Sequence, residues 1–195
     1  MTVRPFGSCW PQAESILTRR LQMEDVLKLI QSRRSIRKFK KAPVSDEQVE
    51  TLLRAAMAAP SAGNEQAWAF LVVRDRAKLD QIPKVHPYAA MVKTAPLAIL
   101  VLGDLSRETH KGYWVQDCSA ATQNILIAAA GMGLGACWCG VHPRPEREEG
   151  LRKLFNLPAH IVPFAVIPVG VPDEKKGPAD YYDPDRVHRE VWGSR

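Results

Sequence analysis

Two short segments contain the residue types and spacing best suited to binding a ligand. The first places three arginines and a serine within five positions, namely Arg33, Arg34, Ser35 and Arg37. Guanidiniums this close repel one another, and each offers parallel N–H donors, so the cluster favours a multiply charged anion such as a phosphate. A solvated basic helix end has the same composition. The spacing alone leaves both interpretations open.

The second segment is a polar turn at residues 60–66, which includes Ser61, Asn64 and Gln66. Their hydroxyl and amide groups can donate to and accept from the edge of a heteroaromatic ring. Gly63 would let the backbone approach such a ring closely. A plain connection between a helix and a strand also uses Ser, Gly and Asn. Taken alone, this turn does not separate a ligand site from a connection.

No set of catalytic side chains accompanies these segments. The sequence shows no Ser-His-Asp or Cys-His order and no carboxylates paired for acid-base work. It also has neither a Walker A loop nor a GxGxxG turn. An enzyme whose cofactor carries the chemistry needs no side-chain nucleophile. The pattern therefore favours a bound, phosphate-bearing cofactor with no catalytic residue and no standard nucleotide loop.

The composition is that of a soluble globular domain, with 195 residues, 46% apolar and 25% charged. The net charge of +6 is concentrated near the start, where residues 1–41 contain ten Lys or Arg and three acids. No reading helix or base-stacking sheet accompanies this charge, so we expect no nucleic-acid partner.

The four cysteines are Cys9, Cys118, Cys137 and Cys139, and the last two lack CxxC spacing. They predict reduced, buried thiols in a cytoplasmic protein, and no metal site. The longest uncharged run, residues 125–141, is interrupted by glycines and does not predict a membrane span.

The apolar periodicity predicts alternating helices and strands and hence an α/β or α+β layered fold with a central sheet. One expected helix begins at Met23, and a second begins at a capping box formed by Ser45 and Gln48 and continues until Ala59-Pro60 stops it. The other expected helices cover 75–82 (ending at Pro83), 114–132 and 146–155. The expected strands cover 68–73, 97–102, 133–140 and 161–169. Residues 1–22 are expected to be a leader or arm, residues 23–195 a single domain, and the tail from about 172 an arm that packs on a partner subunit.

The chain resembles the FMN-dependent nitroreductase family from Met23 to Trp192. The resemblance rests on five motifs in the right order: Arg33 to Arg37 with Phe39, residues 60–68 (PSAGNEQAW), Trp114 to Asn124, Gly133 to Gly140, and Arg186. Where some members have Asn and Lys before the second strand, this chain has Tyr88 and Met91. Where some have Glu-Gly, it has Cys139-Gly140.

The resemblance implies a mainly antiparallel sheet flanked by helices, and an interlocked homodimer with FMN in the subunit interface. Arg33, Arg34, Ser35 and Arg37 would hold the FMN phosphate and ribityl end, joined by Arg186. The other subunit's turn would face the ring or ribityl chain with Pro60, Ser61, Asn64 and Gln66. Cys139 and Gly140 would lie by the isoalloxazine ring.

The activity implied by the resemblance is ping-pong transfer of hydride from NADH or NADPH through FMN to a small-molecule acceptor such as a nitroaromatic or quinone. Two alternatives stay open. The same fold could run a specialised flavin reaction, such as dehalogenation, enone reduction, azoline oxidation or flavin fragmentation. The chain could also bind flavin without turnover.

Overall fold

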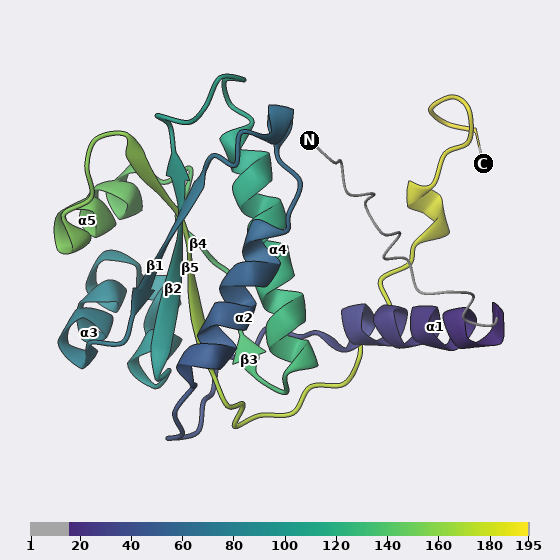
Figure 1. Ribbon diagram of the computed structural model, residues 1–195, viewed down its shortest axis with the longest axis horizontal. Coiled ribbons are helices and arrows are strands. Elements are labelled where there is room, and N and C mark those ends of the chain that lie inside the picture. Colours follow the sequence, from purple (N-terminus) through teal and green to yellow (C-terminus); the bar gives the residue numbers. More distant parts are fainter. Residues whose placement is uncertain (1–15, 195) are drawn as a thin grey trace, which may run out of the picture.

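The computed structural model describes residues 16–194, so most of the expected leader, residues 1–15, lies outside the described residues. The first helix, α1 (Ile16–Ser32), begins before Met23, where the sequence pattern had placed its start. Figure 1 shows α1 projecting from the side of the main body, with the C-terminal tail rising beside it. Val26, Leu27 and Ile30 on α1 are exposed apolar side chains. The helix therefore has an apolar surface that this chain leaves uncovered.

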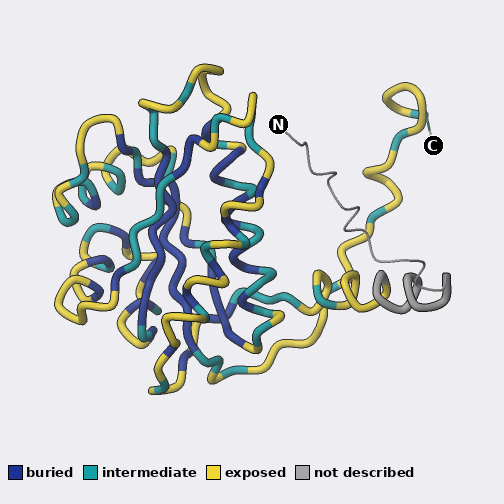
Figure 2. The backbone as a smooth tube through the Cα atoms, viewed as in Figure 1, coloured by how far each residue is buried: buried dark blue, intermediate teal, exposed yellow. Residues whose placement is uncertain are grey.

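Five strands form one antiparallel sheet in the order β1-β2-β5-β3, with β4 also paired to β5. The strands are β1 (Trp68–Val73), β2 (Leu97–Asp104), β3 (Gly135–Ala136), β4 (Cys139–Gly140) and β5 (Ile161–Gly170). Residues on both faces of β2 and β5 are buried, which explains their continuous apolar sequences. These two strands form the dark centre of the molecule in Figure 2.

Helices cover both faces of the sheet, as Figure 1 shows. On one face lie α2 (Asp46–Met57) and α4 (Trp114–Gly131), and on the other lie α3 (Arg76–Val85) and α5 (Pro145–Phe155). Short 3-10 helices occupy η1 (Ala62–Asn64), η2 (Pro87–Lys93) and η3 (Pro184–Arg186). Separate apolar clusters fill the two spaces between the sheet and its helices. The predicted layered α+β fold with a mainly antiparallel sheet is confirmed.

The local signals for helix α2 are confirmed, whereas the predicted end of α3 is wrong. Ser45 caps α2 by accepting from the Gln48 N–H at 3.2 Å, and the Gln48 side chain accepts from the Ser45 N–H at 2.9 Å. Helix α3 was predicted to end at Pro83 but continues to Val85. It continues because the His86 N–H donates to the Ile82 carbonyl at 2.9 Å and closes one more turn.

The predicted strand over residues 133–140 is replaced by two short strands, β3 and β4, which pair with the same strand β5. Ala136 pairs with Val169 and Cys139 with Val166, so Pro168 stands opposite Cys137 in this register. Proline has no N–H to donate, and the ladder is interrupted there. The chain between β3 and β4 is thereby released from the sheet at Cys137 and Trp138.

Within residues 16–194, no helix has both the length and the apolar character needed to cross a membrane. Cys118, Cys137 and Cys139 are buried free thiols, as predicted, whereas Cys9 lies outside the described range. No group of three or more His, Cys, Asp or Glu side chains in the described part of the chain is arranged to hold a metal ion.

Candidate functional site

The arginine segment follows the last residue of α1 and packs on the edge of the sheet. Ser35 forms a parallel bridge with Ala136, and the Ile36 N–H donates to the Ala136 carbonyl at 3.0 Å. The Ile36 side chain packs on Gly135, where an added Cβ would lie 2.6 Å from it. The absence of a side chain at position 135 is what allows this close approach.

The C-terminal tail forms the other wall of this region. Lys40 N–H donates to the Val171 carbonyl at 2.9 Å, and Asp173 N–H donates to the Lys38 carbonyl at 2.8 Å. Further along, the Ala179 N–H reaches the Gln31 carbonyl at 3.3 Å. The tail therefore runs beside the arginine segment, although the two are far apart in the sequence.

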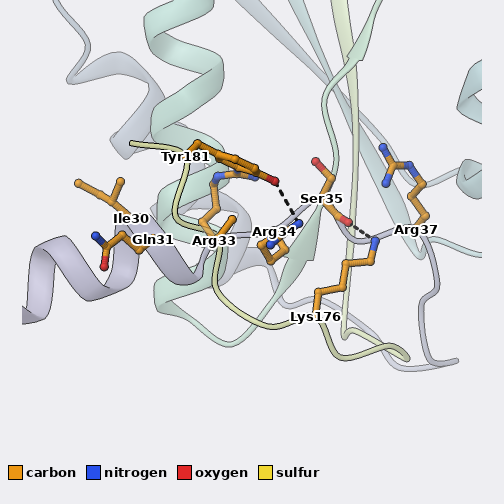
Figure 3. Close-up of a pocket in the computed structure, with 9 residues that line it drawn as sticks. Ile30, Gln31, Arg33, Arg34, Ser35, Arg37, Lys176 and Tyr181 are labelled. Atoms are coloured by element: carbon orange, nitrogen blue, oxygen red, sulfur yellow. Dashed lines mark hydrogen bonds between the residues drawn. The ribbon is translucent and has the colours of Figure 1, made fainter. Parts of the chain in front are cut away.

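Between these two segments lies a pocket of about 410 Å³, which we call the arginine pocket and which Figure 3 shows. Its lining residues are Ile30, Gln31, Arg33, Arg34, Ser35, Arg37, Lys176, Ala179 and Tyr181. The structure thus brings together all four residues of the predicted phosphate cluster. It adds Lys176 and Tyr181, which sequence reasoning missed, because nothing in the tail's sequence shows that it returns to the arginines.

The arginines of this pocket differ in how they are held. Arg34 donates to the Gly177 carbonyl at 2.9 Å and lies 3.5 Å from the Tyr181 hydroxyl. The guanidiniums of Arg33 and Arg37, by contrast, have no hydrogen-bond or ion-pair partner among the described residues. Two cationic forks lining one pocket without a counter-ion fit a phosphate group.

Glu174 balances only part of this charge. Its carboxylate accepts from the Arg37 backbone N–H at 2.5 Å and pairs with the Lys176 ammonium at 3.2 Å. The hydrogen bond from the Arg37 N–H is the main reason that the pKa of Glu174 is lowered, and Lys176 adds to it. Lys176 also donates to the Ser35 carbonyl at 2.6 Å. Glu174 therefore holds the loop and neutralises Lys176, and the guanidinium charges remain.

The polar turn, residues 60–66, is ordered by its own side chains. Ser61 Oγ accepts from the Gln66 N–H at 3.0 Å, and the Gln66 amide donates to Asn64 Oδ1 at 3.3 Å. Gly63, Asn64 and Gln66 all have positive φ, near +50° to +56°. A turn with three left-handed residues needs Gly and amide side chains, which explains its composition.

Two carboxylates for which the sequence predicted no role of their own fix this turn in place. Glu65 accepts from the backbone N–H groups of Thr109 and His110, each at 2.9 Å, and pairs with the His110 ring. Asp117, buried on α4, accepts from the Ala62 N–H at 3.0 Å. The family motif at residues 114–124 therefore has a structural role: Asp117 holds the turn, and Asn124 donates to the Ala55 carbonyl at 2.9 Å.

The polar turn and the arginine pocket lie at opposite ends of the body, as Figure 1 shows. Helix α2 connects the two ends and has 12 residues, a rise of about 18 Å. The structure therefore does not bring Pro60, Ser61, Asn64 and Gln66 to the arginine pocket of the same chain.

The predicted ring-side residues occupy strand β4. Cys139 is buried, whereas Gly140 is exposed and its carbonyl accepts from Arg147 at 3.0 Å. A Cβ at Gly140 would have no neighbour nearer than Trp138 Nε1, at 4.0 Å. The backbone at Gly140 therefore faces open space that a flat ring can approach.

Arg186 lies on η3 in the tail, away from the arginine pocket of its own chain. Its side chain is 85% exposed and pairs with Asp183 at 3.0 Å. Arg186 therefore does not line the arginine pocket of its own chain.

Comparison with known proteins gives a consistent result. The family model described as "Nitroreductase family" matches residues 30–90 and 80–171. A protein of Methanothermobacter thermautotrophicus, provisionally named NADH dehydrogenase/NAD(P)H nitroreductase, is 55% identical over 168 residues, covering 86% of this chain and 88% of that protein.

Solved structures agree with the sequence matches. An FMN-dependent nitroreductase from Clostridium difficile is 30% identical with a TM-score of 0.80, covering 85% of this chain and 99% of that one. A provisionally named nitroreductase from Desulfovibrio desulfuricans, in complex with FMN, is 32% identical with a TM-score of 0.75, covering 86% and 97%. This chain belongs to the nitroreductase family.

Proposed function

We propose that the protein is an oxidoreductase that uses FMN to pass electrons from NADH or NADPH to electron-poor acceptors, nitroaromatics or quinones, by a ping-pong mechanism. The observation that carries this proposal is the arginine pocket, with the guanidiniums of Arg33 and Arg37 unpartnered within the described residues. The names of the relatives support it, because one is called FMN-dependent and another was solved with FMN.

The pocket residues would anchor the cofactor by its phosphate. Arg33 and Arg37 have donors to offer, and Arg34 is oriented by the Gly177 carbonyl. Ser35 can add a hydroxyl donor, and Lys176, whose charge Glu174 balances, holds the pocket wall through the Ser35 carbonyl. This concentration of cations also favours negative charge on a bound group when it is reduced.

When bound, FMN would supply the hydride chemistry between NAD(P)H and the acceptor. The chain's part is to hold the ring against the backbone of Gly140, whose side-chain face is open. Because donor and acceptor would use the same open face, one must leave before the other binds. No side chain of the protein needs to act as acid, base or nucleophile.

The active form in this proposal is a homodimer. Helix α1 and the tail expose large apolar side chains, including Val26, Leu27, Tyr182 and Trp192, the last 89% exposed. An exposed apolar surface of this kind is typical of a protein–protein interface, and a second copy of the chain would bury it. Figure 2 shows this part of the chain as largely exposed. In the dimer, the partner's polar turn and Arg186 would complete each FMN site, which explains why one chain leaves them far from its own arginine pocket.

We place the protein in the cytoplasm, since its buried cysteines are free thiols. The acceptor is a small molecule, and the proposed partners include neither a nucleic acid nor a membrane.

The proposal is tested by spectroscopy and stopped-flow kinetics on the purified full-length protein. We expect a yellow protein whose flavin absorbance bleaches on mixing with NADH or NADPH and recovers on adding a nitroaromatic. A halogenated phenol, added in parallel, tests for dehalogenation. A colourless protein that stays free of FMN after incubation with excess cofactor would overturn the proposal, and a bound flavin that never bleaches would overturn the enzymatic part.

A further inference from the structure

A third arginine site lies at the end of strand β4, away from the arginine pocket. Arg147, on α5, donates through Nη1 to the Gly140 carbonyl at 3.0 Å. Its guanidinium also lies over the Tyr88 ring, 5.2 Å from the ring centroid. Tyr88 belongs to η2, so three separate segments of the chain meet here. We call Tyr88, Gly140 and Arg147 the β4 corner.

The positive charge of Arg147 has no carboxylate partner among residues 16–194. The neighbouring acid on α5, Glu148, is bound to the His142 ring at 2.8 Å instead. The Gly140 carbonyl takes one N–H of the guanidinium, and the Tyr88 ring contributes a cation–π contact. Further N–H groups of Arg147 therefore remain to bind an anion, and a guanidinium fork matches a carboxylate best.

The β4 corner is fixed but open. Arg147 is half-buried and is held from two sides, by a carbonyl and by a ring, which lowers the entropy that it loses on binding a ligand. Gly140 is exposed, and a Cβ there would have no neighbour nearer than 4.0 Å. Tyr88 is 75% exposed. A flat molecule that approaches the Gly140 backbone would thus have a fixed cation at its rim.

We propose that Arg147 binds a carboxylate on the electron acceptor, so that the preferred acceptors are aromatic acids. This inference rests on the proposed function, which puts the flavin ring at Gly140, and it names the class of acceptor that the same site selects. Tyr88 is a positioning residue in this proposal, because its ring holds the guanidinium. The carboxylate binds as an anion, and the proposal adds no chemical step.

The test compares 4-nitrobenzoate with 4-nitrobenzamide, which have the same ring and nitro group and differ in charge. Without NADH or NADPH neither compound is reduced, so titration of the FMN-loaded, full-length protein gives an equilibrium Kd from the change in flavin absorbance. We expect the carboxylate to bind about tenfold more tightly than the amide, the effect of one charge-assisted contact. Added salt should reduce this preference, because a half-buried ion pair is partly screened.

Substitutions then assign the preference to Arg147. Arg147→Gln should bring the ratio of the two Kd values close to one, and Arg147→Lys should retain part of it, since the charge remains. Tyr88→Leu should reduce the ratio less than Arg147→Gln does. The matched control is Arg152→Gln on the same helix, where the guanidinium donates to the Pro158 carbonyl at 2.6 Å. The control should keep the parent's ratio.

Equal binding of the two compounds by the parent protein overturns the inference, and so does a preference that survives in Arg147→Gln. Equal weakening of both compounds in that variant also overturns it, because the guanidinium would then act on the flavin or the backbone. If Arg147→Gln melts early, the parent's ratio at low and high salt decides. Failure of the proposed function looks different: the parent's flavin would be absent or would not bleach with NADH or NADPH.

Discussion

The arginine pocket and the polar turn, at opposite ends of the body, differ in what their polar groups contact. In the turn, Ser61, Asn64 and Gln66 bond within the turn, and Glu65 fixes it to the neighbouring loop. In the pocket, Arg33 and Arg37 have no side-chain partner among the described residues. The turn's interactions therefore go into its own stability, whereas the pocket keeps donors available for a ligand.

The largest expected effect is on cofactor affinity at the pocket. Replacing both unpartnered guanidiniums (Arg33→Ala with Arg37→Ala) should weaken FMN binding at least about 100-fold, because each charge-assisted group contributes about 1.5–3 kcal/mol. Stability of the FMN-free protein should change little, since neither guanidinium has a hydrogen-bond or ion-pair partner among the described residues. Fluorescence titration with FMN measures the affinity, and thermal melting of the FMN-free protein measures the stability.

The matched control removes two cations elsewhere, Arg54→Ala with Lys153→Ala, whose partners are Glu50 and Glu149. Its FMN affinity should match the parent's. If this variant weakens binding as much as the pocket variant does, general charge, and not the pocket, holds the cofactor.

Arg186→Ala tests whether the tail contributes a charged group to the FMN site of the proposed dimer. Within one chain Arg186 pairs only weakly, in an exposed ion pair with Asp183. We expect melting to be unchanged and FMN affinity to fall about tenfold, the effect of losing one charge-assisted contact. Lys175→Ala, at an exposed tail residue, is the control. Parent-like FMN affinity in the Arg186 variant would remove it from the site.

At the turn, the expected effect is on stability. Gly63→Ala should lower the free energy of unfolding by about 1 kcal/mol or more, because φ is +53° and the new Cβ would lie 2.8 Å from the His110 ring. Gly177→Ala, where a Cβ meets nothing within 4 Å, is the control. Urea denaturation of the FMN-free protein measures both. A Gly63 variant as stable as the parent would show that the turn's conformation is not fixed.

The smallest effect is a pH dependence at Glu65. Burial raises its pKa, but hydrogen bonds from Thr109 and His110 outweigh burial and leave the pKa lowered. Its contribution to stability is therefore complete above about pH 4.3, the unfolded value, and is lost as the pH falls through the folded-state pKa. When the pH is lowered from about 6 to about 3, the melting temperature of the Glu65→Gln variant should fall less than that of the parent protein.

The control for this pH profile is Glu149→Gln, at a surface carboxylate paired with Lys153. It should follow the parent's curve. A Glu65 variant that does the same would mean that the carboxylate does not stabilise the turn.

Local patterns allowed most of the fold to be predicted from the sequence. The capping box at Ser45 and Gln48 identified α2, and the continuous apolar runs identified β1, β2 and β5. The errors arose where tertiary pairing overrides local signals. Pro168 lies opposite Cys137 and interrupts the strand predicted over residues 133–140, which therefore forms as β3 and β4. The hydrogen bond from the His86 N–H to the Ile82 carbonyl extends α3 beyond Pro83.

The site was predictable only in part, for a related reason. The four residues of the arginine cluster lie within five positions, so the sequence alone shows their types and spacing. Lys176 and Tyr181 reach the same pocket through the course of the tail, which has no periodic pattern. Glu65 and Asp117 are single carboxylates whose importance comes from the backbone N–H groups they accept from, and composition does not reveal these.

The contact between Arg34 and Gly177 joins residues 143 positions apart. At synthesis rates of roughly 5–20 residues per second, the ribosome needs on the order of ten seconds to make the intervening chain. The emerging polypeptide thus carries its cationic residues long before the second wall exists. Loading with a phosphate-bearing cofactor is consequently an event of the finished polypeptide, and nascent chains that end before Gly177 should retain no flavin.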